Sequence, residues 1–450
     1  MTSAIQRFAN IRREEVLPLL ASVLFFFCVL SALMVVRPAR EALGMESGLD
    51  TVRWLFVGTA VVTLAVNPVF GFLVARFRRL SFIAATYFFF AGSLLVFWAL
   101  LRFTPDATGE ITGRVFYVWF SVFNLFSTMV FWALMADRFS FEQSKRLFGV
   151  VAVGGTLGAI FGPWLAWNIV ESVGTANLIL IAVGFLCLAV LAAAWVAWLQ
   201  PQQGEPDPDA PESAPAVPGQ PAVDRNAAIG GSAWEGFRAV FRSRYLLAIC
   251  AFVLILAVMA TFIYFTRLAM VAEVADETDA RTALFANIDM WTQIATLVLQ
   301  LFVAGHLMKR IGVSITLMLL PITVLLGFIG LAIVGTIAAL IIFEATFRAV
   351  QRAIMRPARE TLFTVVSRED KYKAKAFIDT FVYRGGDVVG AWTEGLLGRL
   401  GMGLAGLATL VFPLAILWGI LGVWLGRQQG RIADRIEENA RENETGALTY

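Results

Sequence analysis

The chain has 450 residues, of which 59% are hydrophobic and only 15% are charged. A soluble globular protein has about 45–50% apolar and about 25% charged residues, so this composition excludes a soluble enzyme and indicates a membrane protein. Segments that cross lipid must be helices or a closed barrel, because every backbone polar group needs an internal partner. The apolar runs are long and continuous rather than alternating, which favours helices.

A membrane-spanning helix needs about 20 apolar residues. By this measure we predict an all-α membrane protein with twelve transmembrane helices in two six-helix lobes, as in a two-lobed transporter. The predicted spans are 16–36, 53–75, 80–101, 114–136, 148–169 and 175–199 in the first lobe, and 246–268, 284–306, 313–333, 335–356, 375–397 and 403–425 in the second.

The predicted domains follow from the segments between these spans. An N-terminal lobe covers 1–199, and a Pro-, Ala- and Asp-rich disordered linker covers 200–233. The C-terminal lobe covers 234–426 and begins with an interfacial helix near 234–242. The charged segment 427–450 is a predicted solvated tail.

Basic residues in the short loops set the predicted orientation. Arg76, Arg78, Lys145, Lys309 and Lys371 all fall on the side that also holds both termini and the linker. Because inner loops are enriched in Lys and Arg, this side should be cytoplasmic. We therefore expect a multi-pass monomer in the bilayer of the inner membrane, with cytoplasmic N- and C-termini.

A repeated pentapeptide is the most informative motif. Arg37-Pro-Ala-Arg40-Glu41 recurs as Arg356-Pro-Ala-Arg359-Glu360, at the predicted outer end of span one and inner end of span ten. Arginine is costly in lipid, and its forked guanidinium group is well suited to phosphate or carboxylate. Positive-inside anchoring is the alternative, but it does not explain Arg37, Arg40 or Arg267 at outer ends.

Span ten adds charges at regular helical spacing. Glu344, Arg348, Arg352 and Arg356 follow one another at i, i+4, which places them on one helix face. Such a face must meet water, a partner or a ligand rather than lipid. An internal Glu344–Arg348 pair is the alternative, and it leaves Arg352 and Arg356 in excess.

Other polar and small residues interrupt the spans. Asp289 and Gln293 in span eight and Asn124 in span four are buried polar groups for coupling, substrate hydrogen bonding or helix contact. In span five, the glycines of 154–162 allow either close helix packing or a sliding gate.

The sequence lacks the motifs of several enzyme classes. The sequence contains no phosphate-binding P-loop for ATP hydrolysis and no nucleophile–base–acid set, and it has a single histidine. We therefore expect neither an enzyme nor a metal site, no cofactor and no nucleic-acid partner, and transport driven by a gradient or by exchange.

Two loops resemble the signature of the major facilitator superfamily. They are Gly71 to Arg79 and Gly305 to Gly312, in matching places of the two halves, although Ala75 and Lys309 stand where the signature has an acid.

The chain also resembles the ATP/ADP translocase family of plastids and bacteria, in its bacterial branch. The resemblance is carried by Arg37 to Leu43, Trp132 to Asp137, Glu142 to Phe148, Lys371 to Asp379 and Arg384 to Gly386. It implies nucleotide exchange, and it assigns the family's charged positions in helices one, four and ten to Arg40, Asp137 and Arg359. Thr266 stands where the family has an acid in helix seven.

From these motifs and resemblances we predict a secondary transporter that exchanges nucleotides or another phosphorylated anion by alternating access. The predicted substrate-binding residues are Arg37, Arg40, Arg267, Arg348, Arg352, Arg359 and Tyr264, with Tyr117 or Trp119 as further stacking partners for a base. The predicted gating or coupling residues are Glu41, Asp137, Glu344, Glu360, Asp379 and Arg384.

Two alternatives remain from the sequence. One is a proton-coupled facilitator of another organic or inorganic anion, with coupling through Asp289 or Asp379. The other is a membrane scaffold or sensor that transports nothing, in which Arg40 and Arg359 would be dispensable.

Overall fold

The computed structural model describes residues 11–76, 79–104, 106–199 and 233–447. The predicted linker, apart from residue 233, lies outside these ranges. The side chains of 67–81 and 303–310 are also outside the described residues, and with them the two loop signatures and His306.

The first half consists of six long helices after a short 3₁₀ turn, η1 (Arg13–Glu15). They are α2 (Val16–Met45), α3 (Leu49–Arg76), α4 (Arg79–Phe103), α5 (Asp106–Arg138), α6 (Phe141–Val173) and α7 (Thr175–Leu199). Each of the six predicted spans of this half matches one helix, and most helices extend several residues beyond the apolar segment.

The second half is also helical but contains more interruptions. It comprises α8 (Ala233–Arg242), α9 (Arg244–Val274), α10 (Thr278–Leu299), η2 (Gln300–Ala304), α11 (Gly305–Val334), α12 (Ile337–Val350), η3 (Gln351–Met355), α13 (Arg356–Thr361), η4 (Leu362–Val365), α14 (Arg368–Phe377), η5 (Ile378–Val382), α15 (Tyr383–Arg399) and α16 (Leu404–Ala447). Gly312, with φ of 72°, breaks α11 where a loop between spans eight and nine was expected.

Nine helices of the described ranges are long and apolar enough to cross a membrane. The remaining three predicted spans are numbers eight, ten and eleven, and each contains a π-helical turn, η2, η3 or η5. Such turns often occur at functional sites, because they redirect side chains along an otherwise regular helix. All twelve predicted spans are therefore present as helical segments.

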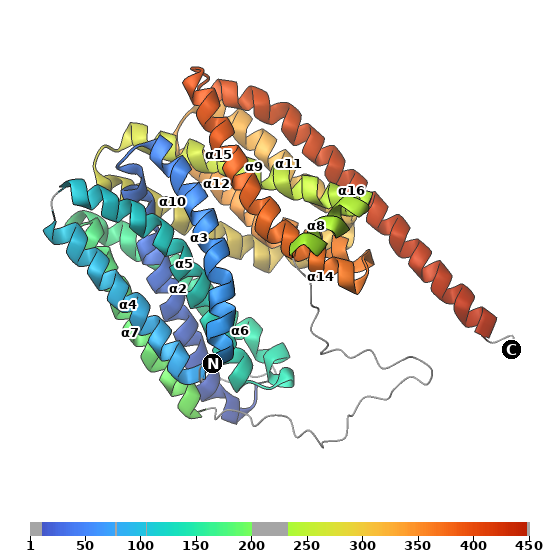
Figure 1. Cartoon of the computed structure of the whole chain (residues 1–450), viewed down its shortest axis with the longest axis horizontal. Helices are drawn as coiled ribbons and strands as arrows, with labels where there is room; N and C mark the ends of the chain where they lie inside the picture. Colours follow the sequence, from blue (N-terminus) through green and yellow to red (C-terminus); the bar gives the residue numbers. More distant parts are fainter. Residues whose placement is uncertain (1–10, 77–78, 105, 200–232, 448–450) are drawn as a thin grey trace.

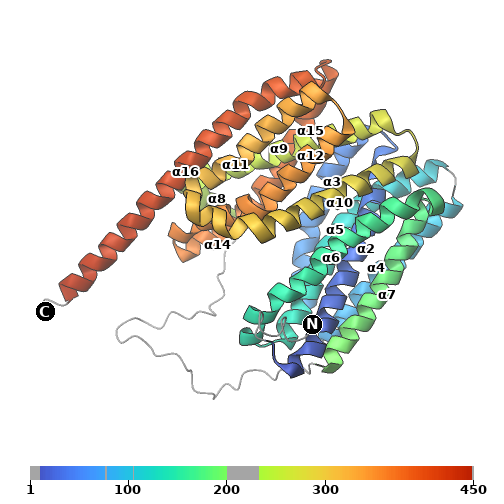
Figure 2. The ribbon, with the colours of Figure 1, turned by 180° about the vertical axis from the view of Figure 1, so that it is seen from behind.

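The helices form two bundles that lie at an angle to each other, as Figures 1 and 2 show from opposite sides. The bundles are closest where α3 passes α15 and where α10 packs against α2 and α6. Toward the end that carries the N-terminus they diverge. The charged end of α16 continues beyond its bundle as a helix, as expected for residues after 427 (Figure 1).

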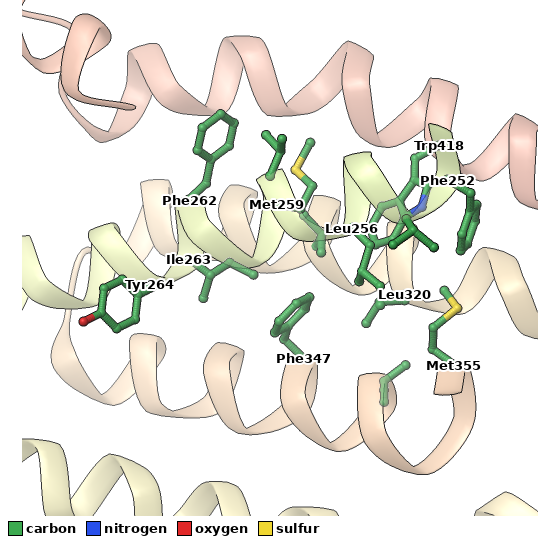
Figure 3. Packing of buried hydrophobic residues seen from close by; sticks show 14 of the residues in the cluster. Phe252, Leu256, Met259, Phe262, Ile263, Tyr264, Leu320, Phe347, Met355 and Trp418 are labelled. Carbon is green, nitrogen blue, oxygen red and sulfur yellow. The ribbon is translucent and has the colours of Figure 1, made fainter. Parts of the chain in front are cut away.

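Each bundle has its own apolar core. One cluster is built mainly from α2, α4, α5 and α7, and the other from α9, α11, α12 and α16. Figure 3 shows part of the second cluster, where Phe252 and Trp418 pack at one end and Tyr264 lies at the other with its hydroxyl directed away from the remaining labelled side chains. The second core therefore ends at a polar group.

Glycines set the spacing of α2 and α6. A Cβ atom on Gly154 would lie 2.4 Å from the carbonyl oxygen of Val23, and one on Gly158 would lie 2.3 Å from that of Phe27. Both positions therefore require glycine for the helix backbones to approach this closely. This contact supports the packing interpretation of these glycines.

The two copies of the pentapeptide differ from the expected placement. The first does not end a helix, because α2 continues to Met45 and contains Pro38 in its interior. The second follows η3 and begins α13. Hydropathy located only the apolar part of α2, so Arg37 and Arg40 lie deeper in the bundle than the predicted boundary of 36.

Candidate functional site

A cavity of about 400 Å³ lies between the two halves and is lined by arginine side chains from both. Arg37 and Arg40 come from α2, Arg352 from η3 and Arg384 from α15. Drug-sized ligands bind in pockets of about 300–1,000 Å³, so this volume suits a small organic molecule. These four guanidinium groups make the cavity suited to bind an anion.

Arg267 of α9 anchors a fully buried charge cluster beside the cavity. Its guanidinium nitrogens lie 3.3 Å from Glu344, 3.5 Å from Asp289 and 3.6 Å from Glu41. The side chains of Arg267, Asp289 and Glu344 have no exposed surface. A buried charge is tolerated only when it is paired, so these four groups depend on one another.

The cluster connects four helices from the two halves. Glu41 belongs to α2, Arg267 to α9, Asp289 to α10 and Glu344 to α12. Arg37 of α2 also approaches Asp289, with Nε 3.5 Å from Oδ2. The ion pairs of α2 with α9 and α10 therefore join the first half of the chain to the second.

The charges around the cavity do not balance. Arg348 pairs with Glu344 at 2.7 Å, the i, i+4 contact that the sequence suggested. Arg352 instead donates to the neutral Oε1 of Gln293 at 2.6 Å. The five arginines 37, 40, 267, 348 and 352 thus meet three carboxylates, Glu41, Asp289 and Glu344, which leaves an excess of two positive charges. An anionic ligand would neutralise this excess.

Arg40 is held by an aromatic and hydrogen-bonded arrangement. Its guanidinium carbon lies 3.5 Å from the centre of the Tyr117 ring, and Nη1 donates to Glu41 at 2.7 Å. The Tyr117 hydroxyl lies 2.7 Å from that of Tyr264, and Tyr264 donates to Glu41. These contacts hold the guanidinium group of Arg40 in one orientation. An exposed arginine would have no such restraint.

Arg384 lines the cavity beside its own partner. Its Nη1 lies 3.2 Å from Oδ2 of Asp387, one turn later on α15. Asp387 also lines the cavity and lies 3.4 Å from the Thr261 hydroxyl. This pair adds no net charge.

The remaining predicted residues lie away from the cavity. Arg359 pairs with Asp379 at 3.0 Å, and Glu360 accepts a hydrogen bond from Lys375. This second cluster begins seven residues beyond the cavity-lining Arg352, or roughly 10 Å along a helix. This cluster therefore joins α13 to the α14–η5 segment. Its members Arg359, Glu360 and Asp379 are not grouped with the arginines of α2.

Arg356 and Asp137 also lie apart from these arginines. Arg356 is exposed at the start of α13, whereas Arg348 and Arg352 are partly buried. The direct contact that the i, i+4 spacing suggested is the ion pair of Glu344 with Arg348, and a shared face for Arg356 stays a prediction. Asp137 is partly buried near the end of α5, about 30 Å along that helix from Tyr117.

The sequence did not indicate an ion pair between the two halves at the end opposite the N-terminus. Arg53 of α3 lies 2.6 Å from Glu394 of α15, and Trp54 and Trp392 pack edge to face beside it. A charge at the start of one apolar span and another inside a second were the available signals. Hydropathy does not indicate which spans are neighbours, so the pair was not predicted.

The comparisons with known proteins agree with this architecture. A family model described as "Major Facilitator Superfamily" matches residues 19–347, so the chain belongs to this superfamily of membrane transporters. Two curated proteins are similar over most of the chain, the "ADP,ATP carrier protein 1" of Chlamydia trachomatis and that of Chlamydia muridarum. Each is 22% identical over 479 residues, which cover 91% of this chain and 88% of the relative.

Solved transporters share the fold. The POT family transporter PepTSo superposes with a TM-score of 0.59 at 14% identity, covering 94% of this chain and 99% of the other. The nucleoside transporter NupG gives 0.56 at 13% identity, with 92% and 99% covered. A bacterial homologue of the human lysosomal transporter Spinster, solved in an inward-facing and unoccupied conformation, gives 0.55 at 13% identity, with 94% of each chain covered. The protein is thus an all-α, multi-pass secondary transporter.

Proposed function

We propose that this transporter exchanges nucleotides, or a closely related phosphorylated anion, across the inner membrane. The observation that carries the proposal is the cavity lined by Arg37, Arg40 and Arg352, with its excess of two positive charges in the adjoining cluster. Phosphate oxygens accept forked hydrogen bonds from guanidinium groups, so a polyphosphate would occupy this wall. The similarity to the ADP,ATP carrier proteins of Chlamydia supports the same substrate class.

The mechanism follows from the ion pairs that the substrate would disturb. Arg37 contacts Asp289, and Glu41 contacts Arg267, so charges of α2 are shared with the second half. A bound phosphate would compete with Asp289 for Arg37 and loosen this connection. In the empty cavity the excess of two positive charges is uncompensated, whereas a bound phosphate would neutralise it. The loaded carrier would therefore change conformation more readily than the empty one, which favours exchange over one-way transport.

The orientation completes the proposal. If the N-terminus is cytoplasmic, the bundles diverge toward the cytoplasm (Figures 1 and 2). The Arg53–Glu394 pair, near the start of α3 and the end of α15, then lies at the outer end. The structure would then correspond to an inward-facing carrier, working as a monomer in the bilayer. The clusters of Arg359 with Asp379 and of Asp137 would act when the inner ends of the halves meet.

Uptake into proteoliposomes tests the proposal. Labelled nucleoside triphosphates and diphosphates are added outside vesicles that contain either unlabelled nucleotide or buffer. We expect uptake that depends on internal nucleotide. If no nucleotide or other phosphorylated compound enters loaded vesicles, the proposed substrate class is wrong.

A proton-coupled anion transporter is the second candidate, favoured by one observation. Asp289 is fully buried, and its Oδ2 has no hydrogen-bond partner among the described residues, although Arg37 lies within ion-pair distance. A carboxylate in this position is suited to exchange a proton for the substrate. Uptake into empty vesicles that is driven by a pH gradient would favour this candidate over exchange.

A further inference from the structure

The same cavity has a second wall whose polar groups carry no charge. This wall is contributed by α3 and α5 and contains the hydroxyls of Thr59, Thr63 and Ser121 and the amide of Asn124. Phe56 and Phe120 line the cavity beside them. Inorganic phosphate or a small carboxylate would be held by the guanidinium groups and is too small to fill this second wall as well.

Two of these hydroxyls are unusual for threonines inside helices. Thr86, Thr112, Thr156 and Thr296 each donate to the carbonyl oxygen four residues earlier, at 2.7–3.1 Å. The Oγ1 atoms of Thr59 and Thr63 are buried and have no hydrogen-bond partner among the described residues. Thr59 is only 7% exposed.

An unpartnered buried hydroxyl is unfavourable unless something else satisfies it. Thr266 and Thr292 also have unpartnered hydroxyls, but they do not line the cavity. Thr59 and Thr63 lie one helical turn apart on the same face of α3, and both residues line the cavity. Their unused hydrogen-bonding capacity therefore lies where a substrate would supply the partners.

We propose that this wall, formed by Thr59, Thr63, Asn124, Phe56 and Phe120, is a subsite for the nucleoside part of the substrate. It rests on the proposed function, because the arginines would hold the phosphates of the same molecule. Hydroxyl and amide groups match ribose hydroxyls and the polar edge of a base, and the aromatic rings provide stacking surface. The cavity volume of about 400 Å³ leaves room for both parts.

With both walls in use, the carrier is selective for a ligand that combines a polyphosphate with a nucleoside. The polyphosphate alone would use only the guanidinium wall, and a nucleoside alone would use only the threonine wall. We therefore expect nucleotides to bind more tightly than either part.

The experiment compares these ligands on purified, full-length protein in detergent. Apparent affinities are obtained from thermal-shift titrations with ATP, GTP, CTP and UTP, with inorganic tripolyphosphate and with adenosine. The variant is Thr59→Val with Thr63→Val, which removes both hydroxyls and keeps the side-chain shape. The matched control is Thr86→Val, whose hydroxyl donates to Phe82 at 2.7 Å.

We expect the double variant to bind its best nucleotide about tenfold more weakly, as loss of hydrogen bonds to a ligand commonly gives. Its affinity for tripolyphosphate should be unchanged, and Thr86→Val should bind both as the wild type does. Because the removed hydroxyls have no hydrogen-bond partner within the described part of the chain, the unliganded variant should melt no earlier than the wild type.

Three results would overturn the proposal. The double variant could bind nucleotides as tightly as the wild type, or lose tripolyphosphate and nucleotide equally. The wild type could bind tripolyphosphate as tightly as any nucleotide, which would leave a phosphorylated-anion transporter without a nucleoside subsite. If the wild type binds no phosphorylated ligand, the proposed function fails together with this subsite.

Discussion

Arg53 of α3 and Glu394 of α15 form an ion pair of 2.6 Å that joins the two halves at the end opposite the N-terminus. Arg53 also contacts Asp50, and its side chain is only 9% exposed. A Cβ atom on Gly395 would lie 2.5 Å from Nε of Arg53, so the glycine makes room for this approach. The pair must break for the halves to separate here, as alternating access requires.

We expect Glu394→Gln to favour the conformation that is open at this end. A loss of about 1.4 kcal/mol of pairing energy changes the ratio of two conformations tenfold. Accessibility is measured with a membrane-impermeant maleimide on Ser121→Cys, in a background without Cys28, Cys187 and Cys250. Labelling from the outer side should increase several-fold.

The control for this measurement is Arg114→Gln. Arg114 pairs with Glu110 within α5 at 3.3 Å, both side chains are about half-exposed, and the pair does not link the halves. It should leave labelling unchanged. Equal labelling in the wild type and in Glu394→Gln would show that the Arg53 pair does not hold the halves together.

Arg267 should be essential to the folded state. Arg267→Leu leaves Glu41, Asp289 and Glu344 buried with one cation fewer, and such a change typically costs about 3–5 kcal/mol. We expect a markedly lower Tm in detergent, measured by the fluorescence of a thiol-reactive dye. The triple variant, with Arg267→Leu, Asp289→Asn and Glu344→Gln, should recover part of the lost Tm. An Arg267→Leu protein with the Tm of the wild type would contradict the pairing of these charges.

Gly44 should control the orientation of Arg40 through Tyr117. A Cβ atom on Gly44 would lie 2.5 Å from the Tyr117 ring, which stacks on the Arg40 guanidinium group. Gly44→Ala should therefore displace the ring and weaken nucleotide binding about three- to tenfold, in line with cation–π energies of about 0.5–2 kcal/mol. Gly92→Ala is the control, since nothing lies within 4 Å of its Cβ position; equal nucleotide affinities of the two variants would contradict a role for the stacking.

The close packing of α2 and α6 predicts opposite effects for two glycines of one helix. Gly158→Ala would place a methyl group 2.3 Å from the carbonyl oxygen of Phe27, and overpacking of this kind costs about 1–3 kcal/mol. Gly149→Ala meets nothing within 4 Å and should be neutral or stabilising by up to about 1 kcal/mol, because alanine favours a helix. Thermal unfolding of both variants checks this, and a Gly158→Ala protein as stable as the wild type would exclude tight packing at this point.

The sequence was sufficient for the spans and for part of the site. Long apolar runs identify membrane helices because lipid imposes one requirement on every residue, and the Glu344–Arg348 pair follows from helical spacing alone. Pro38 did not mark a helix end, since α2 continues through it, and this placed Arg37 and Arg40 deeper than expected. Hydropathy alone does not predict that a helix continues into a charged segment.

Contacts between distant segments could not be predicted in the same way. Asp289 was recognised as a buried acid, but its position between Arg37 and Arg267 depends on how three helices pack. The π-turn η3, which interrupts span ten directly before Arg356, has no simple sequence signal. Thr59 and Thr63 are ordinary residues in the sequence. Among the described residues they are distinguished by lining the cavity and having hydroxyls without a hydrogen-bond partner.

The central claim is that the guanidinium groups of the cavity bind the phosphates of the substrate. The most direct test is the dissociation constant of a labelled nucleoside triphosphate, measured on purified wild type and on Arg37→Gln with Arg352→Gln. Charge-assisted hydrogen bonds contribute about 1.5–3 kcal/mol each, so the double variant should bind about a hundredfold more weakly or worse, while the exposed Arg114→Gln binds normally. Equal affinity of the double variant and the wild type would contradict the account.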